Sequence, residues 1–322
     1  MMKAMVYDRY GSLDVLSLRE IAVPKIKADE VLVRARAAGI HIGDCLLRQG
    51  SPFPVRLVTG LLRPKYGVPG LDVAGTVEAV GSKVTTLKVG DEVFGSGWGT
   101  CAEYVAAKPG QLLLKPASLS FAEAVALATS GTAALCGLRD AGKLQPGQKV
   151  LINGASGAVG TLAVQIAKAL GGQVTGVCST KNIALVQSLG AGAVIDYTQE
   201  DFTKGSARYD LILDNIENHS LTQCRRVLTP NGTLILNSGT EGTGMAMMWR
   251  LLKPVLLAPF VRQKLRRYFS ATNQADLVAL TKLVEAGQLK PVLGKTYPLA
   301  ETRAAFAYIE SGRAQGKVVV TL

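Results

Sequence analysis

The residues with the clearest chemical meaning form a small-residue turn at positions 155–160 of the chain. Alanine at 155 and glycines at 157 and 160 follow the spacing of a dinucleotide fingerprint, with alanine in place of the commoner first glycine. Small side chains at these positions let backbone N–H groups approach a pyrophosphate, and the positive end of the next helix faces it. We therefore predict a pyrophosphate site formed by Ala155, Ser156, Gly157, Ala158, Val159 and Gly160.

The segments on either side of this turn have the patterns that such a site requires. Residues 150–152 are an uninterrupted apolar run, which is typical of a parallel strand buried on both faces. The same glycines could serve only the close packing of an ordinary strand–helix turn, but this context favours the dinucleotide site. After the turn, apolar residues recur at the spacing of one helix face: Val159, Leu162, Ala163, Ile166, Ala167 and Leu170.

The residues about 20 positions after the glycines indicate which nucleotide the turn would hold, because a site for NAD usually has an acidic residue there. Residues 178–182 contain no carboxylate, and their hydroxyls and cation could receive a 2′-phosphate instead. The alternative for Lys181 is a solvated charge at the start of a helix. NADPH is therefore the predicted cofactor, held at this end by Ser179, Thr180, Lys181 and Asn182.

The length and the order of the patterns predict an α/β chain of two domains. At 322 residues the chain exceeds one typical core. Residues 1–120 carry short alternating runs separated by glycine and proline, which predicts a mostly β domain. In residues 121–289 strand and helix patterns alternate, which predicts a doubly wound parallel sheet, and residues 290–322 are expected to return to the first domain.

The composition narrows the possible chemistry and partners. The five cysteines are scattered, without C-x-x-C spacing, and only two histidines occur, so neither a disulfide framework nor a structural zinc site is expected. The net charge of +12 is mostly dispersed, and we expect no nucleic-acid partner; a basic background also suits a phosphorylated cofactor. Residues 1–7 enter a strand pattern directly, without a targeting segment, and we expect a cytoplasmic protein.

Several longer motifs occur in the order found in one family. They are the segments 69–81, 88–94, 153–160 and 316–320, and together they span essentially the whole chain. With them the sequence resembles the medium-chain dehydrogenase/reductase superfamily, and within it the zinc-free quinone oxidoreductase and enone reductase branch. The resemblance implies a GroES-like mostly β catalytic domain, a Rossmann NADP-binding domain, a cofactor cleft between them, and a homodimer.

The positions of the family's zinc ligands differ in this sequence. Zinc alcohol dehydrogenases of the superfamily have cysteine in a G-x-C-x-x-D segment and histidine in G-H-E, and the matching segments here are 39–44 and 70–72. The first ligand position holds His41, but the second holds Leu71, and the third ligand, a cysteine, has no match. Because catalytic zinc keeps three protein ligands, we expect no metal at this site.

The resemblance also implies roles for single residues. Asp44 matches a position that orders the pocket beside the nicotinamide, and Thr132 matches one near the carboxamide. Ser238 and Gly239 follow the last expected Rossmann strand, where the nicotinamide half of the cofactor would lie. Tyr197 matches a tyrosine that contacts the 2′-phosphate, and Lys317 matches a lysine that reaches the cofactor phosphates in some relatives.

Without zinc, members of this branch transfer hydride from the nicotinamide to a quinone or to the β-carbon of an α,β-unsaturated carbonyl. Such a substrate needs a hydrogen bond to the developing enolate and a proton. Many zinc-free relatives have asparagine where this chain has His41, and we hypothesise that His41 hydrogen-bonds the substrate oxygen or donates a proton to it. A polar pocket-lining role without catalysis is the alternative. Two other functions stay open: an enoyl-thioester reductase, and a non-enzymatic NADPH-binding protein that acts as a redox sensor or binds RNA.

Residues 244–268 form a segment that is both apolar and basic. Prolines and charges interrupt it well short of the about 20 apolar residues that cross a bilayer. Three roles are open, in order of preference: a wall of the substrate pocket, part of a dimer interface, and a patch that contacts an anionic membrane.

Overall fold

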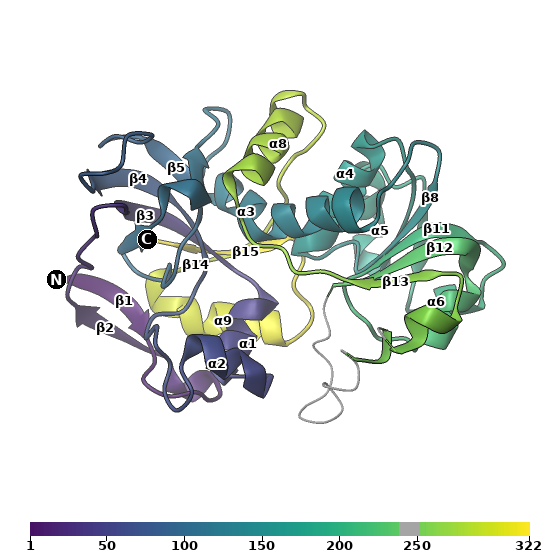
Figure 1. Ribbon diagram of the computed structural model, residues 1–322, viewed down its shortest axis with the longest axis horizontal. Coiled ribbons are helices and arrows are strands. Elements are labelled where there is room, and N and C mark those ends of the chain that lie inside the picture. Colours follow the sequence, from purple (N-terminus) through teal and green to yellow (C-terminus); the bar gives the residue numbers. More distant parts are fainter. Residues whose placement is uncertain (238–251, 255) are drawn as a thin grey trace. The chain divides into compact units, whose positions relative to one another are not determined.

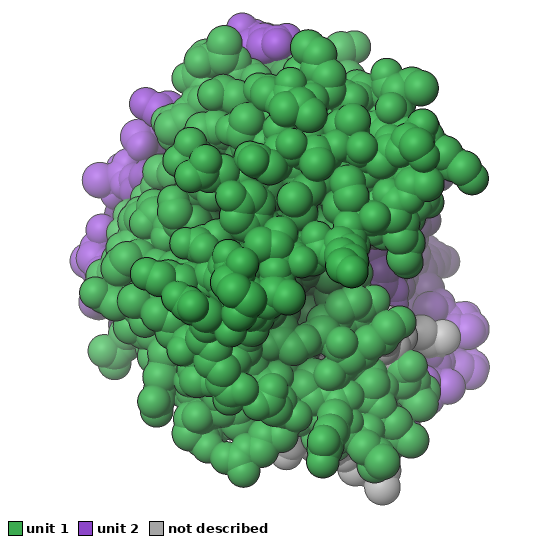
Figure 2. All heavy atoms as spheres, turned by 90° about the vertical axis from the view of Figure 1, so that its left-hand side faces the viewer, with its two compact units in different colours: residues 1–132, 271–282, 291–322 green, residues 133–270, 283–290 purple. Residues whose placement is uncertain are grey.

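The computed structural model describes residues 1–237, 252–254 and 256–322 (Figure 1). Its contacts divide the chain into two compact units, which Figure 2 colours separately. Unit 1 comprises Met1–Thr132, Ala271–Lys282 and Pro291–Leu322, and unit 2 comprises Ala133–Ser270 and Leu283–Lys290. The domain limits near residues 120 and 290 stay predictions, because a division into compact units does not define folding domains.

Unit 1 is built on a seven-stranded sheet with the order β14-β15-β3-β4-β5-β7, in which β6 also pairs with β3. All its strand pairs are antiparallel except β14 with β15. A separate antiparallel pair is formed by β1 and β2. The strands are β1 Met2–Val6, β2 Ser17–Ile21, β3 Val31–Ile40, β4 Asp72–Val80, β5 Glu92–Ser96, β6 Tyr104–Ala107, β7 Leu112–Leu114, β14 Leu293–Pro298 and β15 Lys317–Thr321.

The central strand β3 follows the alternation that its sequence predicts. Val31 and Val33 have no exposed surface, whereas Arg34 and Arg36 are exposed. Side chains of a strand point alternately to its two faces, so one face of this segment packs in the core and the other meets solvent. Burial of the valines stabilises the sheet by about 25 cal/mol per Å² of apolar surface removed from water.

The helices of unit 1 include α1, which follows β3; the predicted catalytic residue His41 is its N-cap, and Asp44 lies in its first turn. A longer helix, α3, continues as a π-helical segment, η4. The combined stretch Phe121–Ala141 is long and apolar enough to cross a membrane, but 72% of its most apolar window is buried in the structure, and a buried core helix passes the same test. The helices within unit 1 are α1 Ile42–Gln49, α2 Arg56–Thr59 and α9 Thr302–Glu310. Helices α3 Phe121–Leu135 and α8 Gln274–Glu285 belong partly to each unit, and η4 Cys136–Ala141 belongs to unit 2.

Unit 2 contains a six-stranded sheet in which every neighbouring pair is parallel. Numbered along the unit, its strand order is 3-2-1-4-5-6, which is the order of the doubly wound dinucleotide-binding fold. The order reverses between β8 and β11, and such sheets bind ligands outside the carboxyl ends of the strands at this point. The strands are β8 Lys149–Asn153, β9 Gln173–Cys178, β10 Ala193–Asp196, β11 Tyr209–Asp214, β12 Leu228–Leu236 and β13 Lys264–Arg267.

Helices cover this sheet, as the sequence pattern predicts. In Figure 1, α4 lies above the strands of unit 2 and α6 lies below them. The apolar face of α4 is buried, including Leu162 and Ile166, which are 2% and 0% exposed. The helices are α4 Ala158–Ala169, α5 Ile183–Ser188 and α6 Leu221–Arg226.

The apolar and basic segment 244–268 lies partly outside the described residues, which omit 244–251 and 255. Its last part contains an element that the sequence pattern did not predict. Residues Lys264–Arg267 form β13, which pairs with β12 at the edge of the sheet of unit 2. Part of the segment therefore belongs to the Rossmann sheet.

Candidate functional site

The turn between β8 and α4 has the backbone geometry of a phosphate cradle. Gly157 caps α4, so the N–H groups of the first helical turn, from Ala158 onward, have no partner within the helix. A Cβ on Gly157 would meet nothing closer than the carbonyl oxygen of Gly154 at 3.6 Å, whereas a Cβ on Gly160 would lie 2.0 Å from that oxygen. Gly157 thus leaves room for a ligand, and Gly160 is required for the packing of the helix on the turn.

The residues predicted for the 2′-phosphate lie just beyond β9 and β10. Asn182 Nδ2 donates to Ser156 Oγ at 3.0 Å and to Ser179 Oγ at 3.2 Å. The run after β9 is therefore joined to the cofactor turn. Lys181 and Tyr197 are exposed and accessible to a ligand, Tyr197 with 59% of its surface.

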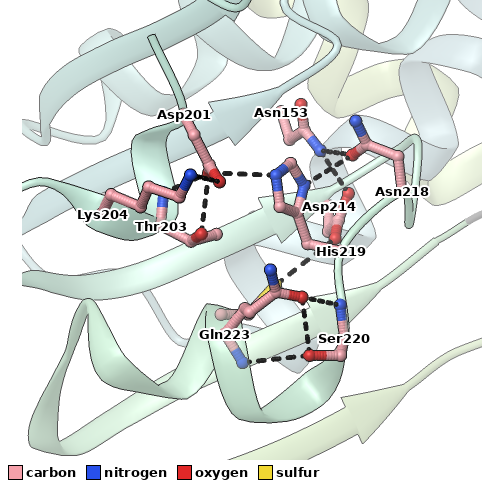
Figure 3. A network of polar contacts seen from close by, with 10 residues as sticks. Asn153, Asp201, Thr203, Lys204, Asp214, Asn218, His219, Ser220 and Gln223 are labelled. Atoms are coloured by element: carbon pink, nitrogen blue, oxygen red, sulfur yellow. Dashed lines mark hydrogen bonds and ion pairs between the residues drawn. The ribbon is translucent and has the colours of Figure 1, made fainter.

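A polar network that the sequence pattern did not identify lies at the ends of β8 and β11 (Figure 3). Asn153, the last residue of β8, donates from Nδ2 to Asp214 Oδ1 at 2.8 Å and to Asn218 Oδ1 at 3.0 Å. His219 Nδ1 lies 3.0 Å from the same Asn218 oxygen, and its Nε2 lies 3.1 Å from Asp201 Oδ1. The network stands where the strand order reverses, which is the ligand-binding position of such sheets.

Asp214 is fully buried within this network. Burial raises the pKa of its carboxyl, and hydrogen bonds from the Glu217 backbone N–H and from Asn153 oppose that shift. Glu217 in turn accepts two hydrogen bonds from Arg267 of β13, at 2.9 and 2.7 Å, which ties the edge strand to this region. One signal could have identified Asn153 and Asp214 in the sequence, because each is a polar residue that ends a mostly apolar strand.

The predicted catalytic residues His41 and Asp44 lie together at the start of α1 in unit 1. Asp44 Oδ2 accepts the His41 backbone N–H at 2.8 Å and lies 3.5 Å from His41 Nε2. Burial raises the pKa of the Asp44 carboxyl, and the neighbouring His41 opposes the shift. Among the described residues, neither His41 Nε2 nor Asp44 Oδ1 has a hydrogen-bond partner. Two buried polar atoms are therefore available to a substrate.

A pocket within unit 1 opens beside Asp44. Tyr66 and Trp98 line it as a stacked pair, with ring centroids 4.2 Å apart. Tyr7 lines it too, and burial raises the pKa of its phenol to about 12, so its hydroxyl stays protonated at neutral pH. Leu71, at the position of the second zinc ligand, contributes an apolar side chain. The cavity has a volume of only about 10 Å³, which is room for one water molecule, so the structure shows the aromatic and apolar walls of a ligand site without the space for a substrate.

The donor atoms around His41 do not fit a catalytic zinc ion, which takes three protein ligands from histidine, cysteine or carboxylate side chains. Leu71 offers no donor atom. Within the part of the chain that the structure describes, no group of three potential ligand atoms includes His41 or Asp44. His41 and Asp44, with Leu71 at the next ligand position, therefore do not supply the three protein ligands that catalytic zinc takes.

Lys317 and Thr132 are both buried in unit 1. Lys317 Nζ lies 2.5 Å from Asp72 Oδ2 and 3.3 Å from Ser130 Oγ. The ammonium group therefore has partners in the interior, and its predicted contact with the cofactor phosphates requires this pair to break. Thr132 Oγ1 has no hydrogen-bond partner among the described residues and could still bind a ligand. The predicted positions Ser238 and Gly239 lie outside the described residues.

Comparison with known proteins identifies the family. The model of the alcohol dehydrogenase GroES-like domain matches residues 27–129, and that of the zinc-binding dehydrogenase domain matches residues 189–320. The chain is 35% identical over 340 residues to the 2-methylene-furan-3-one reductase of Solanum lycopersicum, covering 99% of this chain and 79% of that protein. It is 34% identical over 341 residues to the chloroplastic NADPH-dependent alkenal/one oxidoreductase of Arabidopsis thaliana, with the same coverage.

A solved structure agrees with this assignment. The quinone oxidoreductase from Coxiella burnetii superimposes with a TM-score of 0.88 at 30% identity, covering 100% of this chain and 99% of that one. The two matching domain models, the strand orders and the glycine turn together define a two-domain oxidoreductase with a GroES-like and a Rossmann part. The chain belongs to the medium-chain dehydrogenase/reductase superfamily, which confirms the resemblance and the α/β fold class.

Proposed function

We propose that the chain is a zinc-independent reductase that uses NADPH to reduce quinones or the C=C bond of α,β-unsaturated carbonyls. The observation that carries this proposal is the pair His41 and Asp44 beside an aromatic pocket in which Leu71 replaces a metal ligand. Relatives named for alkenal/one and quinone reduction, at 34% and 30% identity, support the same class of substrate.

The residues of unit 2 support NADPH as the cofactor. When bound, NADPH supplies the hydride. The open side of Gly157 and the first N–H groups of α4 suit its pyrophosphate, and the exposed Lys181 suits its 2′-phosphate. A relative that is itself named NADPH-dependent supports the assignment.

In this proposal, His41 and Asp44 act on the charge and the proton of the reduced substrate. His41 Nε2 donates a hydrogen bond to the substrate oxygen, on which negative charge develops. Asp44 Oδ2 lies 3.5 Å from that nitrogen and orients the imidazole ring.

The test is to measure oxidation of NADPH and NADH at 340 nm with 9,10-phenanthrenequinone, a small enone, an enoyl thioester and a simple aldehyde. We expect turnover with the quinone or the enone and a preference for NADPH. Turnover with the aldehyde alone would contradict the zinc-independent chemistry. Turnover with the thioester alone would favour the enoyl-thioester reductase, and NADPH binding without any oxidation would favour a non-enzymatic sensor.

We also propose a homodimer, which follows the family resemblance, and separately a cytoplasmic location. Light scattering of the purified chain tests the dimer. Co-sedimentation with anionic liposomes at low and high salt tests the third role considered for residues 244–268, and the absence of salt-sensitive binding would remove it.

A further inference from the structure

The run of residues after β9 lacks an acidic side chain, but the neighbouring strand brings one beside it. Asp196 is the last residue of β10 and pairs in register with Cys178, the last residue of β9. The Thr180 hydroxyl donates a hydrogen bond to Asp196 Oδ2 at 2.5 Å. A carboxylate therefore contacts the residues predicted to hold the 2′-phosphate.

Fixed donors hold this carboxylate in place. The backbone N–H of Thr198 donates to Asp196 Oδ1 at 2.9 Å, and the Thr198 hydroxyl donates to the same atom at 2.8 Å. The hydrogen bond from Thr180 is the largest of the interactions that lower the pKa of Asp196. The side chain is thus ionised at neutral pH and keeps its orientation.

These contacts change what Thr180 can do. A hydroxyl has one proton, and a phosphate dianion accepts hydrogen bonds but offers none. With its proton directed to Asp196, Thr180 cannot donate to a 2′-phosphate. Of the residues predicted at this end, Ser179, Lys181 and Tyr197 keep donors that can face the phosphate.

We propose that Asp196 is a determinant of cofactor selectivity that narrows the preference of this enzyme for NADPH over NADH. Its carboxylate repels the 2′-phosphate that Lys181 attracts. It can also accept a hydrogen bond from the ribose 2′-hydroxyl of NADH, as an acidic residue does at the end of the second strand in NAD-specific sheets. The proposal rests on the proposed use of NADPH. It assigns to Asp196, at the end of the neighbouring strand β10, the role that an acidic residue after the second strand has in NAD-specific sheets.

The test compares Asp196→Asn with Glu200→Gln, which removes an exposed charge four positions away. Dissociation constants of NADPH and NADH are measured by nicotinamide fluorescence in low salt, without any electron acceptor. We expect Asp196→Asn to raise the selectivity for NADPH about two- to fivefold, the range for exposed charge pairs, mainly through tighter NADPH binding. We expect the same measurement in 0.5 M salt to give a smaller change, because salt screens the repulsion.

An unchanged ratio in Asp196→Asn, or an equal change in Glu200→Gln, would overturn the proposal. A protein that binds NADPH but oxidises it with no quinone or enone would overturn the proposed function while the selectivity ratio still tests Asp196. Turnover with NADPH together with an unchanged ratio would support the proposed function and overturn the role of Asp196. A protein that binds neither nucleotide would overturn both.

Discussion

Lys317 and Asp72 form a buried ion pair in unit 1, with Nζ and Oδ2 2.5 Å apart and side chains that are 1% and 0% exposed. Asp72 Oδ1 also accepts the Thr129 backbone N–H at 3.1 Å. Lys317 lies on β15, Asp72 on β4 and Thr129 on α3, so the pair joins α3 to the sheet three residues before Thr132. The pair therefore sets the position of a residue predicted to lie near the nicotinamide.

Replacing Lys317 by methionine is expected to destabilise the protein by about 3–5 kcal/mol, because the Asp72 carboxylate stays buried without its partner. The double variant Asp72→Leu with Lys317→Met is the control, and we expect it to lose less than the single variant. Urea unfolding measures both. A lysine that contacts the cofactor phosphates would behave differently: Lys317→Met would weaken NADPH binding with little loss of stability.

The two glycines of the cofactor turn are expected to separate binding from folding. Gly157→Ala adds a methyl group on the open side of the turn, so stability is kept while NADPH affinity falls. Gly160→Ala places that methyl group 2.0 Å from the Gly154 oxygen, and a loss of about 1–3 kcal/mol or more is expected from overpacking. Thermal unfolding and NADPH titration of both variants check this. Equal stability of the two variants would contradict the assigned roles.

Removing the charge of Lys181 is expected to weaken NADPH binding and leave NADH binding nearly unchanged. Because the side chain is exposed, we expect a loss of about tenfold, at the lower end for a charged hydrogen bond. Lys204→Ala, another exposed lysine of unit 2, is the matched control. If Lys181→Ala binds both nucleotides as tightly as the native chain does, Lys181 is a solvated charge and does not bind the 2′-phosphate.

His41→Ala tests the proposed donor to the substrate oxygen, because alanine, unlike asparagine, offers no hydrogen-bond donor in its place. Loss of a positioned acid or hydrogen-bond donor typically costs about 100-fold or more in rate, and we expect kcat with the quinone or enone to fall by that order. KM for NADPH should change little, because the proposed role of His41 is toward the substrate oxygen and not toward the cofactor. An unchanged kcat and pH profile would leave His41 as a pocket-lining residue.

Asp44 is expected to make stability depend on pH in a particular direction. Burial raises its pKa in the folded state, so its contribution to stability is present below the ordinary range of a carboxyl group and is lost as pH rises through the raised pKa. The stability of the native chain relative to Asp44→Asn should therefore fall with increasing pH, by at most about 1.4 kcal/mol per pH unit, and then level off. Urea unfolding of both proteins from pH 4.5 to 8.5 measures this difference, and a difference that rises with pH would contradict it.

Local patterns were sufficient for most of the elements. The apolar run at 150–152, for which the sequence predicts a buried parallel strand, lies in β8 with all three side chains fully buried. The strand Lys264–Arg267 could not be predicted in the same way, because three of its four residues are basic. It becomes a strand by pairing with β12, which is a property of the assembled sheet.

The sequence by itself determined the glycine turn and the loss of a zinc ligand at Leu71, because both depend on which residue types stand at a short, local spacing. Only the tertiary structure decided the partners of Lys317 and Thr180. Asp72 lies 245 positions before Lys317, and Asp196 lies 16 positions after Thr180 on a neighbouring strand. Side chains on separate strands meet according to strand order and register, and no spacing in the sequence specifies either of these.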